Sequence, residues 1–553
     1  MKQFFLLLLV TIFTFSCKSD VNTKPSTTKS VKPKLVIGIV IDQMRYDYLT
    51  RFDHRFGEGG FKRIINNGYN LKNTHLNYTP SKTAVGHASI YTGTTPRNHG
   101  IMGNDWYDKY EQKSVNNSDD DNYESVGSTT KNGQKSPNKL ITNTIGDQLH
   151  LSQNMQGKVI GIAIKGRGSI LPVGHSANAS YWFDKGTEGK WVTSTYYMNS
   201  LPKWVSDFNN SKIAENYLNS TWDTYYDIDT YTNSGVDDDP HEQKYYAKEK
   251  TTFPYDLSTL KEKNKFYKLL LYSPQGNSMT TDFAMKAIES ENLGKTEMTD
   301  FLALGYSSTD GIGHQFGPNS VEIEDAYIRM DLELERFLNF LDKQVGKGKY
   351  TIFLTADHGV SHIPYDLKEL NFPGGYRSKK LIRKYVEAIV DRKFGNPKLI
   401  EHIENNSIFI NEKQLKKSHL KREDVADVIA IELIKNGKIH KTATHKTLAT
   451  NGFNEGMLAL MQRGFNQKLS GDVMFLYTPS MLGDWNKNKG GSNHGSGYNY
   501  DNHIPLLFYG AGIKVGSSNH YYPITDIAST ICTLMEIEFP NGNTGKVIEE
   551  VLE

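Results

Sequence analysis

Several continuous apolar runs in this chain end directly in acidic, basic or histidine side chains. The run 35–41 (LVIGIVI) shows no alternation of apolar and polar residues, which predicts a parallel strand buried on both faces. Similar runs lie at 159–164, 301–306, 351–355 and 504–509. Helical patterns separate these runs, such as 320–341 with its apolar stripe. Strands that alternate with helices predict an α/β fold with a doubly wound central sheet and helices on both faces.

The residues that follow these runs can bind metal ions or anions. They are Asp42, Lys165, Arg167, Asp310, His314, Asp357 and His358. Taken alone, an aspartate after a strand is usually a helix cap or a turn residue. However, ligands of doubly wound sheets bind at the carboxyl ends of the strands. The repetition in four segments therefore predicts that these side chains meet in one crevice.

The set combines aspartates and histidines without cysteine. Such oxygen and nitrogen ligands suit Zn²⁺ and can also hold Mn²⁺ or Mg²⁺. Asp310 and His314 are four residues apart, close enough to reach one ion, and the adjacent Asp357 and His358 can share one ion or bridge two. Two metal ions about 4 Å apart are the usual arrangement for in-line displacement at phosphorus. A network of salt bridges and caps is the alternative interpretation.

A further candidate lies between the first two runs. Thr83 stands immediately before a predicted helix, where backbone N–H groups favour anions. A threonine in this position is commonly an N-cap, and periodicity alone favours that interpretation. The alternative is a nucleophile that a metal ion activates.

Six short segments, taken in chain order, resemble the alkaline phosphatase superfamily. They are Asp42 after the first run, Thr83 in SKTAVGH, Asn104 in MGN, TDGIGH at 309–314, DHG at 357–359 and SNHG at 492–495. Within the superfamily the chain is most similar to the phosphate-irrepressible monoesterase alkaline phosphatases of Gram-negative bacteria. The resemblance covers nearly all of the chain from residue 35 to about 535, and it implies an alkaline-phosphatase-like fold.

The resemblance also implies two Zn²⁺ ions with one ligand set each. One set would be Asp310, His314 and His494 (zinc 1), and the other would be Asp42, Asp357, His358 and Thr83 (zinc 2). Thr83 would then be the nucleophile and carry a phosphothreonine intermediate. The implied function is the hydrolysis of phosphate monoesters with broad specificity and release of inorganic phosphate.

Lys165 and Arg167 help to distinguish between related activities. A monoester presents a dianionic phosphoryl group, which suits the planar fork of an arginine and the point charge of a lysine. In the monoesterase subgroup a matching lysine and arginine contact the phosphate, together with an asparagine that corresponds to Asn104. The alternative function is a phosphodiesterase or nucleotide pyrophosphatase with the same metals and nucleophile. A binding protein that has lost turnover is the alternative outside the enzymes.

The N-terminus indicates export. An apolar run at 4–15 follows Lys2, which predicts a signal peptide over 1–17, because the run is too short to span a bilayer. The polar segment 18–34 predicts a flexible linker, followed by the catalytic domain at 35–553. Cys17 resembles a bacterial lipoprotein processing site, so a lipid anchor and simple cleavage both remain open. We expect a periplasmic protein, attached to the outer membrane if Cys17 is acylated.

Two stretches interrupt the alternation of strands and helices. The Tyr-, Asn- and Trp-rich stretch at about 168–297 is predicted to be an insertion that covers the crevice, and 367–483 is predicted to be a small α+β lobe. The 64 basic and 62 acidic side chains balance, which does not favour nucleic acid as a dedicated partner. The expected partners are small phosphate monoesters. The sequence leaves the oligomeric state open, and a monomer is compatible with it.

Overall fold

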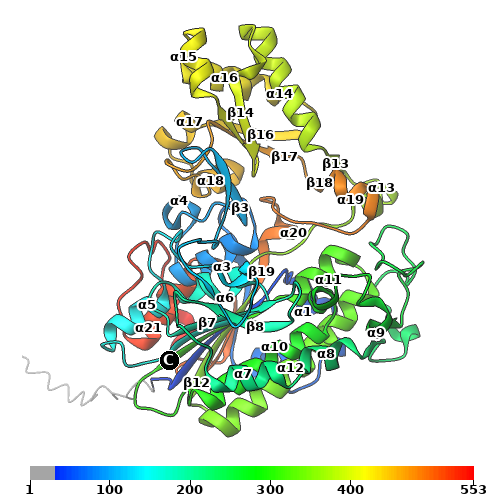
Figure 1. Cartoon of the computed structure of the whole chain (residues 1–553), viewed down its shortest axis with the longest axis vertical. Coiled ribbons are helices and arrows are strands. Elements are labelled where there is room, and N and C mark those ends of the chain that lie inside the picture. The colour runs from blue at the N-terminus through cyan, green and yellow to red at the C-terminus, as the bar shows by residue number, and fades with distance from the viewer. Residues whose placement is uncertain (1–31) are drawn as a thin grey trace, which may run out of the picture.

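The computed structural model describes residues 32–553, with a ten-stranded sheet at its centre (Figure 1). The strand order is β20-β2-β19-β12-β1-β11-β6-β7-β8-β5. The strands are β1 (Leu35–Ile41), β2 (Tyr69–His75), β5 (Ser125–Val126), β6 (Val159–Ala163), β7 (Ala179–Asp184), β8 (Lys190–Ser194), β11 (Asp300–Tyr306), β12 (Tyr350–Thr355), β19 (His503–Gly510) and β20 (Gly516–Pro523).

The middle of the sheet is parallel. The strands β12, β1, β11, β6 and β7 run in the same direction, and every residue of β1, β11 and β12 is buried. Their unbroken apolar sequences reflect helices on both sides. The run at 504–509 forms β19, which pairs antiparallel with β12, so the sheet is mixed. As a result, β19 begins at the edge of the sheet where the parallel strands β12, β1, β11, β6 and β7 end.

Helices cover both faces of the sheet. One layer holds α3 (Thr83–Thr92), α5 (Ile145–Ser152), α6 (Gly166–Val173) and α21 (Asp526–Met535), and the other holds α2 (Phe61–Asn67), α10 (Gln275–Ser290) and α12 (Val321–Leu341). The predicted apolar stripe of α12 is buried. Each large apolar side chain that is fully buried in this way contributes about 1.5–3 kcal/mol. The doubly wound α/β architecture is thus confirmed.

The stretch 168–297 differs from the expected insertion. Strands β7 and β8 belong to the central sheet, and α6 and α10 pack on it. Trp191 and Trp222 are buried in the main core. Only the part between β8 and α10 lies outside the sheet layers, with α7 (Lys203–Asn210), α8 (Ile213–Leu218) and η4 (Phe266–Tyr272). Aromatic side chains gave this region an unusual composition because they fill the core beside the sheet.

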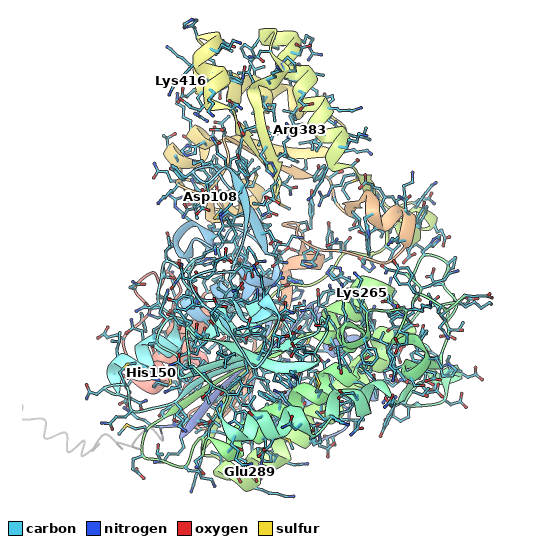
Figure 2. The ribbon with its side chains drawn as sticks, viewed as in Figure 1. Asp108, His150, Lys265, Glu289, Arg383 and Lys416 are labelled. Carbon is cyan, nitrogen blue, oxygen red and sulfur yellow. The ribbon has the colours of Figure 1, made fainter. Side chains whose placement is uncertain are left out.

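The second stretch forms a separate lobe at the top of Figure 1. Its helices are α14 (Lys379–Phe394), α15 (Glu412–Ser418) and α16 (Arg422–Leu433), and its sheet has the order β14 (Ile400–Glu404), β15 (Ser407–Ile410), β17 (Val473–Tyr477) and β16 (Ile439–Thr444). The lobe has its own hydrophobic core. Figure 2 shows Arg383 and Lys416 on the lobe and Asp108 below it, on a hairpin that reaches up from the body. Ser114 of this hairpin donates to Glu404 at 2.9 Å.

The predicted signal peptide, Cys17 and most of the predicted linker lie outside the described residues. The end of that linker is already part of the fold, because the Lys34 N–H donates to the Lys349 carbonyl at 2.7 Å and the Thr299 hydroxyl donates to the Pro33 carbonyl at 2.7 Å. A search of residues 32–553 finds no helix that is both long and apolar enough to cross a membrane.

Candidate active site

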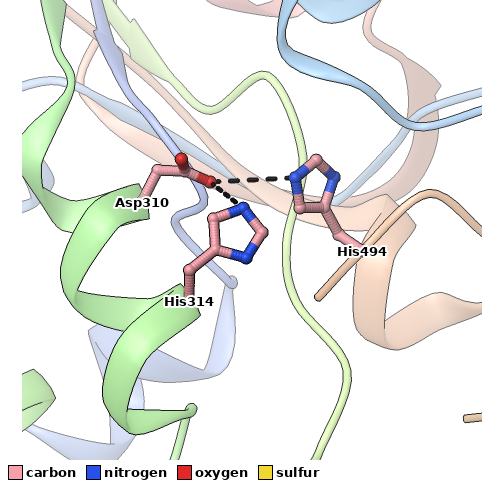
Figure 3. A group of neighbouring side chains, drawn as sticks. All are labelled: Asp310, His314 and His494. Atoms are coloured by element: carbon pink, nitrogen blue, oxygen red, sulfur yellow. Dashed lines mark ion pairs between the residues drawn. The ribbon is translucent and has the colours of Figure 1, made fainter. Parts of the chain in front are cut away.

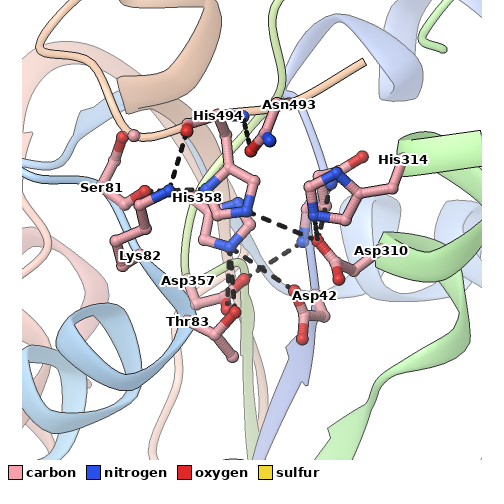
Figure 4. Close-up of polar contacts among 12 residues, drawn as sticks. Asp42, Ser81, Lys82, Thr83, Asp310, His314, Asp357, His358, Asn493 and His494 are labelled. Atoms are coloured by element: carbon pink, nitrogen blue, oxygen red, sulfur yellow. Dashed lines mark hydrogen bonds and ion pairs between the residues drawn. The ribbon is translucent and has the colours of Figure 1, made fainter. Parts of the chain in front are cut away.

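The carboxyl ends of three adjacent strands bring the predicted aspartates together (Figure 4). Asp42 follows β1, and Asp357 follows β12. Asp310 lies in α11 (Ser308–Phe316), which begins just after β11. His494 comes from the loop before α20 (Asn499–Asn502) and β19. It reaches the same edge because β19 is antiparallel to β12.

Asp42, Asp357 and His358 form a cluster that we call the inner triad. The three residues offer ligand atoms that all lie within 4.8 Å of one another. His358 Nε2 lies 3.6 Å from Asp42 Oδ1 and 3.4 Å from Asp357 Oδ2. The exposed fraction is 2 % for Asp42 and 0 % for the other two residues. The inner triad is therefore shielded from solvent.

Asp310, His314 and His494 form a second cluster, the outer triad (Figure 3). Asp310 Oδ1 lies 3.2 Å from His314 Nε2 and 3.7 Å from His494 Nε2. The side chain of His314 remains 30 % exposed. The rings of His358 and His494 stack with 3.5 Å between their centroids. The two triads are therefore in direct contact.

Hydrogen bonds at Nδ1 orient each of the three histidines. His314 Nδ1 lies 3.0 Å from the Ser492 carbonyl, His358 Nδ1 lies 2.9 Å from the Gly359 carbonyl, and His494 Nδ1 lies 2.8 Å from the Ser81 carbonyl. A carbonyl only accepts, so each Nδ1 carries a proton, and Nε2 is the ring nitrogen that faces the aspartates of the two triads. Such second contacts are the usual way in which a protein orients metal-binding histidines.

The electrostatics of the site fit divalent cations. Among the described residues, the buried atoms Asp42 Oδ1 and Asp357 Oδ2 have no hydrogen-bond partner. Burial, and then the neighbouring Asp357, raises the pKa of Asp42 well above its ordinary value. Burial lowers the pKa of His358 and His494 well below the ordinary value, which keeps both rings neutral. Neutral imidazoles and carboxylate oxygens without protein partners are a donor set for two metal ions.

Thr83 faces the inner triad from the start of α3. Its Oγ1 lies 3.3 Å from His358 Nε2. The N-cap position belongs to Lys82, and the side chain there makes no capping hydrogen bond. Helix α3 comes very close to the inner triad at Gly86, where a Cβ would lie 2.3 Å from the Asp357 carbonyl oxygen. The hydroxyl of Thr83 therefore points toward the inner triad and does not cap its helix.

Lys165 joins the two triads. Its Nζ donates to Asp42 Oδ2 at 2.6 Å and to Asp310 Oδ2 at 2.5 Å. Burial opposes the charge, but Asp310 and Asp42 outweigh it and raise the pKa of Lys165. The ammonium therefore stays protonated. An ammonium has three N–H groups, so one is left for a ligand.

Arg167 and Asn104 line the same cavity as Thr83 and Lys165, with a volume of about 350 Å³. Asn104 Oδ1 accepts a hydrogen bond from the Ala84 N–H at 3.0 Å, which fixes the amide beside the first turn of α3. Within residues 32–553, Arg167 makes no ion pair or side-chain hydrogen bond. The guanidinium is thus available to an anion in the cavity.

Gln43 is a site residue that the sequence did not indicate. Its backbone N–H donates to Asp357 Oδ1 at 3.1 Å, and its side-chain amide donates to Asp310 Oδ1 at 2.6 Å. The backbone φ of Gln43 is 70°, a left-handed conformation that is uncommon outside glycine. Its position directly after Asp42 was the available signal, but glutamine is not a typical metal ligand.

A doubly wound sheet with two Asp/His triads and a threonine hydroxyl at one edge indicates a phosphoric ester hydrolase with a site suited to metal ions. Comparison with known proteins agrees with this class. Residues 36–487 match the model of a family described as type I phosphodiesterase / nucleotide pyrophosphatase. The chain belongs to this family, within the alkaline phosphatase superfamily.

Similar proteins match over nearly their whole length. A protein of Myroides odoratus named calcium-transporting ATPase is 43% identical over 96% of this chain and 96% of that protein. Alkaline phosphatase PafA of Elizabethkingia meningoseptica is 42% identical over 94% of this chain and 95% of that protein. A crystal structure of alkaline phosphatase PafA superposes with a TM-score of 0.90 at 42% identity, covering 94% of this chain and 99% of that one. The predicted superfamily and fold are confirmed.

Proposed function

We propose that the chain is a two-zinc alkaline phosphatase that hydrolyses phosphate monoesters with broad specificity and releases inorganic phosphate. The observation that carries the proposal is the position of Thr83, whose hydroxyl lies 3.3 Å from His358 Nε2 in a cavity that Lys165 and Arg167 also line. The alkaline phosphatase names of similar proteins support the same activity.

In this mechanism Thr83 Oγ1 attacks phosphorus in line with the leaving oxygen and loses its proton, while the P–O bond to the leaving group breaks and the leaving oxygen takes up a proton. Water then attacks the phosphothreonine in a second in-line step, which releases inorganic phosphate and restores the hydroxyl. When bound by the two triads, Zn²⁺ ions supply the Lewis acidity that activates a threonine hydroxyl at neutral pH and offsets charge on the phosphoryl oxygens. Two inversions give net retention at phosphorus.

Lys165, Arg167 and Asn104 would bind the phosphoryl group through the first step. A terminal monoester carries one more charged oxygen than a diester. A fixed guanidinium and ammonium that face this oxygen favour the monoester, because charge-assisted hydrogen bonds are the stronger ones. The runner-up activity, phosphodiester or pyrophosphate cleavage, uses the same triads and Thr83 but gains less from these two cations.

A paired ester assay tests the proposal. We expect a higher kcat/KM for p-nitrophenyl phosphate than for bis(p-nitrophenyl) phosphate. The double variant K165A/R167A should lose most of this preference, with a much larger loss on the monoester. A wild-type preference for the diester, or equal losses on both esters, would contradict the monoesterase assignment.

Metal analysis tests the zinc assignment separately. The purified protein should hold two zinc ions per chain, and a burst of phosphorylated Thr83 should appear in a single turnover with excess enzyme. A binding protein without turnover would form no phosphothreonine.

We further propose export to the periplasm, which rests on the apolar run at 4–15. Cell fractionation with and without residues 1–17 tests export, and metabolic labelling with a fatty acid tests acylation of Cys17. Retention of the full chain in the cytoplasm would contradict it.

A further inference from the structure

The cavity beside Thr83 carries more positive charge than one phosphoryl group requires. Five cationic residues line it, and Asp310 is the one carboxylate among the lining residues described. The five are Lys135, Lys165, Arg167, Lys185 and Lys268. A volume of about 350 Å³ lies within the range of small-ligand sites, roughly 300–1,000 Å³. The cavity therefore has both the room and the charge for a substrate with more than one anionic group.

Lys185, like Asp42, Lys165 and Asp357, follows a parallel strand of the central sheet. It follows directly after β7, which runs parallel to β6, so it stands at the same edge of the sheet as Lys165. The neighbouring Asp184 forms no ion pair with Lys185 in the described residues, and its carboxylate instead accepts hydrogen bonds from Ser128 and Thr130, both at 2.8 Å. Within the described part of the chain, the Lys185 ammonium has neither an ion pair nor a hydrogen bond.

Lys268 lies in η4 and faces the same cavity. Its Nζ lies 5.8 Å from the centroid of the Tyr272 ring, and it too lacks an ion pair with any residue in 32–553. Lys135 differs, because Asp119 pairs with it. Lys185 and Lys268 are therefore the two cavity lysines whose charge no protein carboxylate offsets.

The charges around Lys185 also repel one another. Burial, followed by Arg167 and Lys165, lowers the pKa of Lys185 to about 8. Burial also lowers the pKa of Lys268. Cations that are close together without a counter-charge cost free energy that a bound anion would recover.

Lys268 lies where the cavity beside Thr83 meets a second cavity, while Lys185 lines the first cavity alone. A second cavity of about 470 Å³ shares His314, Lys268 and Tyr272 with the first. It leads outward past Tyr246 and Trp485, which are 58% and 51% exposed. The cavity beside Thr83 therefore adjoins the second cavity at His314 of the outer triad and at Lys268. A leaving group that extends in this direction would bring a second anion to the lysines.

We propose that Lys185 and Lys268 form a second phosphoryl subsite, which selects monoesters whose leaving group carries another phosphate. Two ammonium groups match the double charge of a terminal phosphate better than the single charge of a carboxylate. The inference rests on the proposed monoesterase function, since it names the substrate class of that site.

Adenosine 3′,5′-bisphosphate and the two adenosine monophosphates form a matched set of substrates. The wild type should hydrolyse the bisphosphate with the higher kcat/KM. In the variant K185A/K268A, kcat/KM for the bisphosphate should fall by about 10-fold or more for each lost contact, which corresponds to about 1.4 kcal/mol per contact. The kcat/KM for the two monophosphates should fall much less. The charge-preserving variant K185R/K268R should retain most of the preference. Higher ionic strength should reduce the wild-type preference in the same direction.

Lys263→Ala is the matched control, because Lys263 is exposed, close to Lys268 in sequence and outside the cavity. Equal losses on all three substrates, or no wild-type preference for the bisphosphate, would overturn the subsite. A calorimetric titration of Thr83→Ala protein with adenosine 3′,5′-bisphosphate measures the binding affinity without any turnover. Tighter binding of the bisphosphate than of the monophosphates, lost in T83A/K185A/K268A, supports the subsite even if the monoesterase proposal fails. Equal affinities there would refute it.

Discussion

The inner and outer triads contain the same types of side chain but differ in their surroundings. The inner triad is buried beneath α3, and its two carboxylates keep oxygen atoms without hydrogen-bond partners. The outer triad borders the cavity, and the side chain of His314 remains 30 % exposed. Thr83 lies within hydrogen-bonding range of the inner triad alone.

This difference assigns separate tasks to the two triads. An ion held by the buried inner triad, beside the proposed nucleophile Thr83, would exchange little with water. An ion held by the outer triad, at the cavity wall, would be placed to contact the leaving group in the proposed mechanism. Lys165 and Gln43 contact residues of both triads, so the two tasks remain coupled.

The largest expected effect comes from a substitution of Thr83, the proposed nucleophile. Thr83→Ala should lower kcat by about 10³-fold or more, because removal of a nucleophile abolishes the covalent route. Both metal ions should remain bound, since the six side chains of the two triads are unchanged. Steady-state kinetics and metal analysis of the same sample provide the measurement. Near-normal turnover would contradict the assignment, and Thr83→Ser serves as the control that keeps a hydroxyl.

Removal of one histidine from each triad tests their separation directly. His314→Ala should weaken the outer site by about 10–100-fold or more and leave one tightly bound equivalent. His358→Ala should lose the inner ion and also the contact with Thr83, so its activity should be the lower of the two at saturating zinc. Zinc titration with a chromophoric chelator measures both sites. Loss of both ions in His314→Ala would mean that the triads form one cooperative unit.

The pH dependence of the metal-free protein probes the inner triad. Burial raises the pKa of Asp357 from its ordinary 3.8 to about 7. The folded carboxyl therefore binds a proton that the unfolded chain has already lost between about pH 4 and 7, so the contribution of Asp357 to the free energy of unfolding falls as pH rises through this window. Metal binding removes the proton, and the zinc-loaded protein should lack this contribution.

Urea unfolding from pH 5 to 8, with and without chelator, measures this effect. Because buried histidines such as His358 and His494 contribute a slope of the opposite sign, the test is the difference between wild type and Asp357→Asn. In the metal-free protein, the free energy of unfolding of Asp357→Asn should rise more steeply, or fall less steeply, with pH than that of the wild type. Identical slopes for the two proteins would refute the burial argument.

The smallest effect is expected at Gly86. An alanine there would place its Cβ 2.3 Å from the Asp357 carbonyl oxygen, so α3 must shift away from the inner triad. We expect a loss of about 1–3 kcal/mol in unfolding free energy and a reduced kcat. Gly437→Ala is the control, because no atom lies within 4 Å of the added Cβ. An unchanged kcat in Gly86→Ala would show that the position of Thr83 tolerates this shift.

The sequence predicted most of the sheet and the side chains that cluster at its edge. Buried parallel strands leave long apolar runs, and four of these runs correspond to β1, β6, β11 and β12 within a residue at either end. The aspartates that follow three of these strands come together because adjacent parallel strands end at one edge. His494 precedes its strand, β19, instead of following it, because β19 is antiparallel to β12. An apolar run does not reveal the direction of its strand, so His494 was found only from its sequence motif.

The rest depended on contacts that a linear pattern does not contain. Strand β7 lies in the Tyr-, Asn- and Trp-rich stretch at about 168–297, which was predicted to be an insertion. Lys185 was therefore not recognised as a residue that follows a parallel strand. Gln43 acts through two hydrogen bonds to residues that are distant in the chain. Both are polar residues outside a recognisable motif, whose role arises only from their neighbours.

The stacked rings of His358 and His494 lie where the chain leaves the body for the upper lobe and where it returns. Ions held by both triads would fasten these two points together and close the long loop between them, with the entropic benefit of a cross-link. A chain whose two cysteines are Cys17 and the buried Cys532 would thus use coordination chemistry for a task that a disulfide often performs. Changes in the length or shape of the lobe between His358 and His494 would then leave the spacing of the two triads unchanged.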